Sequence, residues 1–183
     1  NKLADFLVSI GYTRLKSDNC AYVRREKSGL LTMLLVYVDD VMVIASKTVM
    51  AFVKGQIAKH FKVKDEGECT AFLGIGFTRD RLRKTFALSL KLYLGDGISK
   101  FNLSRASSRD TPMAARTMLS RGTPAQVAKA SEKPYLSACG TAIYAATHTR
   151  PDAAFATFQC CKYMSRPTLE HWSSIMRVFR YYI

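Results

Sequence analysis

The sequence lacks several features that would place it in a common class of protein. Its five cysteines form an odd set with no Cys-x-x-Cys pair and no histidine at zinc-ligand spacing, which argues against a disulfide framework and a zinc site. We therefore expect an intracellular, reducing compartment. No uninterrupted apolar run approaches the ~20 residues that a membrane span requires, so no membrane partner is expected. No targeting peptide is recognisable.

Acidic residues are also scarce. The 183 residues include 14 Asp+Glu against 28 Lys+Arg, a formal net charge of +14. Such an excess attracts polyanions, and nucleic acid is the polyanion that we expect. The charge is spread along sequence that also has apolar periodicity, which fits a folded basic surface better than a basic tail. Solubility alone is the other explanation for the charge.

The apolar patterns predict an α+β fold, with a mixed part followed by a helical part. The mixed part has expected helices at 2–10 and 48–61 and extended segments at 21–25, 30–46, 71–77 and 85–90. Residues 104–130 are rich in Ser, Arg, Thr and Ala with two prolines, which is typical of a linker. The helical part has expected helices at 131–149, from Pro151, and after Pro167. The predicted division of the chain is therefore 1–103, 104–130 and 131–183.

The most informative stretch is LLTMLLVYVDDVMVIAS, residues 30–46. Two apolar strands flank Asp39 and Asp40, which stand where a tight hairpin turn is expected. Asp-Asp is an ordinary turn dipeptide. However, carboxylates at the tip of a buried hairpin are unfavourable unless a cation neutralises them. Magnesium binds a few carboxylates together with substrate phosphates, as in two-metal phosphoryl transfer. On the dipeptide alone, both interpretations stay open.

The longer pattern resembles a known family. Tyr37-Val38-Asp39-Asp40 between apolar strands resembles the polymerase signature of reverse transcriptases, and LLVYVDDVMVIAS resembles the hairpin of the copia-type retrotransposon enzymes. Further landmarks of that family follow in order and at sensible spacing, at residues 7–12, 16–18, 61–65, 72–75, 111–113, 135–144, 149–152, 165–167, 171–172 and 177–181. The resemblance therefore extends over essentially the whole chain.

The resemblance implies an RNA-directed DNA polymerase with fingers, palm and thumb regions. Residues 1–103 would be a partial palm of β-hairpins packed on helices, and residues 131–183 a helical thumb or connection. Asp39 and Asp40 would be the catalytic, metal-binding carboxylates, with Mg²⁺ as cofactor. Tyr37 would lie against the template–primer, and Phe72-Leu73-Gly74 would belong to a hairpin that grips the primer end.

The helical part is expected to contact the phosphates of RNA or of an RNA/DNA duplex. Its apolar faces are assigned to the core, so its basic side chains should point outward. Those expected to bind nucleic acid are Arg150, Lys162, Arg166, Arg177 and Arg180.

One departure from the family pattern decides the predicted role. By the resemblance, the first catalytic aspartate lies upstream of Asn1, within Asp-x-x-x-Ala-aromatic, and most of the fingers are missing too. Asp18 begins a similar string, but its Ala and aromatic come one residue early. By the resemblance it also stands where the family has an ordinary Ser-Asp turn. We therefore expect a fragment or remnant that binds nucleic acid without catalysis of its own, and with no metal if the carboxylates are vestigial. The alternative is a structural RNA-binding subunit held by other protein chains in a large ribonucleoprotein.

Overall fold

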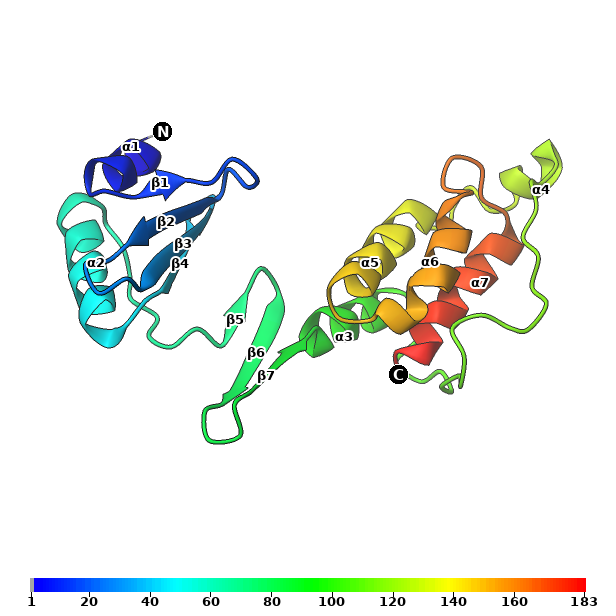
Figure 1. Cartoon of the computed structure of the whole chain (residues 1–183). Coiled ribbons are helices and arrows are strands. Elements are labelled where there is room, and N and C mark those ends of the chain that lie inside the picture. Colours follow the sequence, from blue (N-terminus) through cyan, green and yellow to red (C-terminus); the bar gives the residue numbers. More distant parts are fainter. Residues whose placement is uncertain (1) are drawn as a thin grey trace. The chain divides into compact units, whose positions relative to one another are not determined.

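A computed structural model describes residues 2–183. The chain divides into two compact units between Cys69 and Thr70. Each unit combines helices with one antiparallel sheet (Figure 1), which confirms the predicted α+β class. None of the helices within 2–183 combines the length and the hydrophobicity that crossing a bilayer demands.

The first unit contains two helices and a four-stranded sheet. Its elements are α1 (Lys2–Ser9), β1 (Thr13–Arg14), β2 (Ala21–Arg25), β3 (Leu31–Tyr37), β4 (Asp40–Ile44) and α2 (Lys47–His60). The strands lie in the order β1-β2-β3-β4, and every neighbouring pair is antiparallel. Sequential hairpins therefore build the whole sheet.

Both helices pack on one face of this sheet. Leu34 on β3 lies opposite Tyr22 and Val43 in the ladder, and it shares a buried core with Leu7 of α1 and Val53 of α2. Because side chains alternate between the faces of a strand, Leu31, Tyr37 and Ile44 belong to the other face. Each of them is about half exposed. The sheet thus has one helix-covered face and one open apolar face within this unit.

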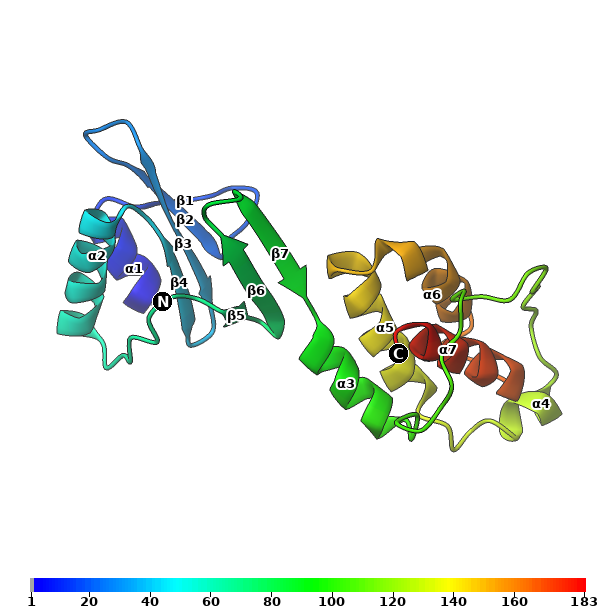
Figure 2. The same ribbon diagram turned by 90° about the horizontal axis from the view of Figure 1, so that it is seen from below.

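The second unit begins with a small sheet and continues as helices. Its strands β5 (Ala71–Phe72), β6 (Ile75–Asp80) and β7 (Thr85–Ser89) form an antiparallel sheet in that order. The helical elements are α3 (Lys91–Lys100), α4 (Pro124–Ala128), α5 (Tyr135–His148), the 3₁₀ turn η1 (Pro151–Ala153), α6 (Ala154–Cys161) and α7 (Leu169–Tyr181). Helices α5, α6 and α7 pack against one another, and α3 packs on α5 and α7 (Figure 2).

Small residues allow these helices to approach closely. The buried core contains Ala138, Ala142 and Ala156, against which the larger Ile175 and Phe179 of α7 pack. The buried hydroxyl of Tyr135 donates a hydrogen bond to the Cys160 carbonyl at 2.8 Å, tying α5 to α6. Helix α7 begins with a capping box, in which the Thr168 hydroxyl accepts from the His171 N–H and the His171 ring accepts from the Thr168 N–H.

Two parts of the second unit differ from the sequence expectation. Helix α3 was not predicted, because Gly95 and Gly97 lower helix propensity. Gly97 nevertheless allows close packing, since a Cβ there would lie 3.1 Å from the Thr141 methyl of α5, a tight contact. The segment 104–130, expected as a linker, is mostly irregular but packs on the helices. Its Leu119 carbonyl accepts a hydrogen bond from the Tyr163 hydroxyl at 2.6 Å.

Candidate active site and nucleic-acid interface

The two adjacent aspartates lie at the tip of the β3–β4 hairpin. Tyr37 pairs with Asp40 as the last rung of the ladder, so Val38 and Asp39 form a two-residue turn. The predicted hairpin turn at this position is confirmed. Val38 has φ 51°, a left-handed conformation that is unfavourable for a β-branched residue. A positive φ at the first central residue is the pattern of type II′ hairpin turns.

This tip projects into solvent. Val38 is 80% exposed, and both Asp39 and Asp40 are exposed. The expectation that the carboxylates end a buried hairpin is therefore wrong, because the core of this unit stops at Val36 and Val41. Within residues 2–183, neither carboxylate is engaged in a hydrogen bond or an ion pair. Four oxygens of the type that Mg²⁺ prefers are thus free to bind a cation.

No further metal ligand joins this pair among the described residues. Across residues 2–183, no three His, Cys, Asp or Glu side chains gather in a way that could hold a metal ion. Asp18 is engaged locally, since its carboxylate accepts a hydrogen bond from the Cys20 N–H at 2.8 Å. This is an Asx turn, in agreement with the turn assigned to Asp18 from the sequence.

The segment Phe72-Leu73-Gly74 lies at the turn between β5 and β6. Phe72 pairs with Ile75, leaving Leu73 and Gly74 as the turn residues, with φ 53° and 79°. Two positive φ values in succession are the mark of a type I′ hairpin turn. Glycine accepts such a φ readily, whereas leucine does not. Leu73 therefore holds an unfavourable backbone conformation in this turn.

A tyrosine of α5 holds this turn in place. The Tyr144 hydroxyl donates a hydrogen bond to the Leu73 carbonyl at 2.6 Å. The Tyr144 ring packs on Tyr93 of α3 and on His148, with centroid distances of 4.9 and 4.2 Å. The β5–β6 turn and the helices are thus connected within one compact unit. Sequence reasoning missed this contact because 71 residues separate its two partners.

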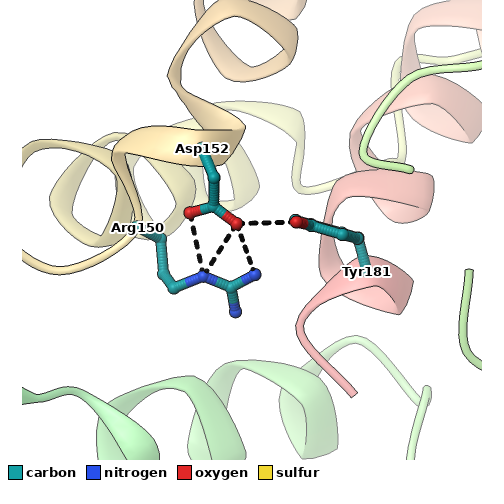
Figure 3. A network of polar contacts seen from close by, with 3 residues as sticks. All are labelled: Arg150, Asp152 and Tyr181. Carbon is teal, nitrogen blue, oxygen red and sulfur yellow. Dashed lines mark hydrogen bonds and ion pairs between the residues drawn. The ribbon is translucent and has the colours of Figure 1, made fainter. Parts of the chain in front are cut away.

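Arg150 does not lie on a helix, contrary to expectation; it stands just before η1. Its guanidinium donates to both carboxylate oxygens of Asp152, with Nη2–Oδ2 at 2.8 Å, and the Tyr181 hydroxyl donates to the same oxygen at 2.7 Å (Figure 3). The guanidinium also lies over the Tyr181 and Tyr182 rings, 4.9 and 4.8 Å from their centroids. These contacts hold the pKa of Asp152 down at about 2, chiefly through the hydrogen bond from Arg150.

Arg177 and Arg180 project from successive turns of α7 but are partly buried. The Arg177 Nε and Nη2 donate to the carbonyl and hydroxyl of Thr111 at 3.1 and 2.9 Å. Arg180 binds the carbonyl and hydroxyl of Ser107 in the same way. Each arginine therefore holds a segment of its own chain against the helix. The expectation that both side chains point outward is therefore met only in part, because each is partly exposed but is bound to its own chain.

Lys162 and Arg166 do point outward. Both are exposed, and Lys162 contacts only Gln159, at 2.9 Å among the described residues. Lys162 directly follows α6, and Arg166 lies in the loop before α7. Of the five expected nucleic-acid contacts, these two are the ones whose charged ends face solvent without holding the fold.

Residues 1–115 match the family described as reverse transcriptase (RNA-dependent DNA polymerase). This match covers more than half of the chain, and the chain therefore belongs to the reverse transcriptase family. Its particular branch is copia-type, as the sequence resemblance indicated, because retrotransposon proteins match almost its full length.

Three of these relatives are plant transposon polyproteins. The chain is 32% identical to the retrovirus-related Pol polyprotein from transposon TNT 1-94 of Nicotiana tabacum, over 98% of this chain and 14% of that protein. It is 30% identical to the Pol polyproteins from transposons RE2 and RE1 of Arabidopsis thaliana, over 98% of this chain and 12% of each. The chain thus spans about an eighth of these relatives. No solved structure matches it significantly.

Proposed function

We propose that this chain supplies Asp39 and Asp40 to the metal centre of an RNA-directed DNA polymerase and binds its template–primer. The single observation that supports this most strongly is the β3–β4 turn, which presents two adjacent carboxylates to solvent with no ion-pair partner within residues 2–183. Because the chain belongs to the reverse transcriptase family, we assign the two carboxylates of this turn to the metal centre of the polymerase.

The residues at the turn fit Mg²⁺. Asp39 and Asp40 offer only carboxylate oxygens, which magnesium binds together with substrate phosphates. Bound there, the metal would activate the attacking 3′ oxygen and stabilise the leaving oxygen in nucleotide transfer. Two metals need a third carboxylate to hold them in register, and residues 2–183 bring none to this pair. We therefore propose that this segment does not catalyse by itself.

Tyr37 would support the primer. Alternation along β3 places its ring on the open face of the sheet, away from α1 and α2, and on the same face as its ladder partner Asp40. The ring is about half exposed. It can therefore contact the sugar or base of a nucleotide whose phosphate lies near the metal, because aromatic rings stack on bases without regard to sequence.

A metal titration tests the proposed site directly. Mn²⁺, a paramagnetic substitute for Mg²⁺, should first broaden the amide signals of residues 37–40 in a nitrogen–proton NMR spectrum. Asp39→Asn combined with Asp40→Asn should abolish this broadening. Asp110→Asn, which neutralises an exposed aspartate elsewhere, should leave it intact. Equal broadening in the double variant would overturn the assignment of the metal site.

Polymerisation is tested separately. The purified chain with Mg²⁺, nucleotides and a primed RNA should show no templated extension. Nucleotide incorporation that Asp39→Asn abolishes would overturn the proposal that the segment is inactive alone. Binding of the primed RNA should still occur, and should weaken steeply with salt, because phosphate contacts release counterions.

A further inference from the structure

The second unit contains a basic hollow between α7 and the irregular segment that α7 holds. Its volume is about 360 Å³, which is in the range of small-ligand sites. Three arginines line it together with three hydroxyl side chains, and the rest of the lining is apolar. The polar lining residues are Arg109, Arg177, Arg180, Ser173, Ser174 and Thr117. None of the lining residues within the described chain is acidic.

The charge of this hollow is uncompensated. Arg109, Arg177 and Arg180 form no ion pair with any Asp or Glu of residues 2–183. Like charges gathered without a counterion repel one another, so the arrangement favours a bound anion. Arg150, in contrast, has its own carboxylate in Asp152, and it does not line the hollow.

The guanidiniums are held in position before any ligand arrives. Arg177 and Arg180 each use Nε and Nη2 to bind one residue of the 107–111 segment. A guanidinium has five N–H donors, so three on each side chain have no partner among the described residues. The same segment is fastened by its backbone, since the Arg109 N–H donates to the Arg180 carbonyl at 3.0 Å. This hydrogen bond holds the backbone of Arg109 in place beside α7.

We infer that this hollow binds a phosphate group of the nucleic-acid backbone. Planar guanidiniums bind phosphate oxygens in pairs. Serine hydroxyls such as those of Ser173 and Ser174 are common additional donors to phosphate, whereas the Thr117 hydroxyl already donates to the Ala114 carbonyl at 2.8 Å. This inference rests on the proposed function, because template–primer is what would bring the phosphodiester to α7.

Arg109→Ala is the sharpest variant, because Arg109 is exposed and its side chain makes no hydrogen bond or ion pair within residues 2–183. Arg105→Ala is the matched control: it removes the same charge from an exposed arginine of the same segment that does not line the hollow. Ser173→Glu places a negative charge at the exposed lining without touching an arginine. Thermal unfolding of all three shows that the fold is kept.

The first measurement is duplex affinity at several salt concentrations, by fluorescence anisotropy with the full chain. Loss of one phosphate contact flattens the plot of log affinity against log salt by about 0.9. Arg109→Ala and Ser173→Glu should show this change and bind about eightfold more weakly at 0.1 M salt. Arg105→Ala should bind like the wild type. Identical behaviour of Arg109→Ala and Arg105→Ala would overturn the inference while leaving duplex binding, and the proposed function, intact.

The second measurement uses inorganic phosphate and distinguishes the source of the ligand. Phosphate should raise the unfolding temperature of the wild type above that in chloride of equal ionic strength, and should do so less for Ser173→Glu. If phosphate binds but the variants hold duplex as tightly as the control, the hollow takes a free phosphate compound and the nucleic-acid assignment is wrong. If the wild type holds no duplex at all, the proposed template–primer role fails together with this assignment.

Discussion

The guanidinium of Arg150 and the carboxylate of Asp152, two residues apart, form a two-pronged ion pair at 2.8 to 3.3 Å. The pair lies between α5 and α6, and the Tyr181 hydroxyl connects it to the end of α7. The connection between α5 and α6 is therefore joined to the end of α7 at one carboxylate (Figure 3). Several expected outcomes concern this junction and the two hairpin turns.

Tyr181→Phe should lower the free energy of unfolding by about 1 kcal/mol, because it removes one hydrogen bond to a carboxylate and keeps the ring beneath Arg150. Denaturant unfolding measures the effect. Tyr93→Phe is the control, since the Tyr93 hydroxyl has no hydrogen bond within residues 2–183. Equal losses in both variants would mean that the Tyr181 contact has no particular importance.

The stabilisation from Asp152 should depend on pH. Its folded-state pKa is about 2, below the value near 3.9 expected in an unfolded chain. Stabilisation by the ionised carboxylate is therefore complete above about pH 4 and is lost as the pH falls towards 2. The wild type should exceed Asp152→Asn in stability at pH 6, and the difference should shrink over that window. A difference that stays constant from pH 6 to pH 2 contradicts the ion pair.

Val38→Asn should stabilise the first unit by about 0.5–1 kcal/mol, because asparagine tolerates a positive φ better than a β-branched residue does. Val63→Asn makes the same chemical change at an exposed position whose φ is not positive, and it should leave stability nearly unchanged. Thermal unfolding compares them. A destabilised Val38→Asn would show that the turn relaxes without strain.

Tyr144→Phe should loosen the β5–β6 turn while the helices stay folded. Loss of the hydrogen bond to Leu73 is worth about 1 kcal/mol, which corresponds to about fivefold faster amide exchange in β5 and β6 through local opening. Hydrogen-exchange mass spectrometry resolves this hairpin from α5 and α7. Unchanged exchange at the hairpin, or equal acceleration everywhere, would contradict a local role for Tyr144.

Local patterns in the sequence were sufficient for much of the fold. The β3–β4 hairpin followed from two apolar strands around Asp39-Asp40, and α7 from its apolar spacing after Pro167. Helix α3 was missed because its two glycines are poor helix formers, and their value appears only when Thr141 and Phe179 pack against Gly97. Propensity is a local property, whereas that contact is made between distant segments.

The candidate site was predictable to the same extent. The turn that presents Asp39 and Asp40 is a local feature, and so it could be read from neighbouring residues. The partners of Arg177 and Arg180 lie 66 and 73 residues away in the sequence. No sequence spacing connects these arginines with their partners, so the sequence could predict only that their side chains point outward. In the structure, segment 107–111 lies against α7, and Arg177 and Arg180 bind it while staying partly exposed.

Several arginines hold segments of the chain together, so replacing them affects the stability of the fold as well as the net charge. Arg24 shows it in the first unit: it binds Glu26 and the Ile10 carbonyl while lying over the Tyr12 ring. Lysine at such a position, or at Arg150 or Arg177, preserves the formal charge but lacks the flat, forked geometry that makes several bonds at once. Exchange between the two basic residues therefore leaves the net charge at pH 7 unchanged, yet it should be tolerated at Lys162 and selected against at Arg24.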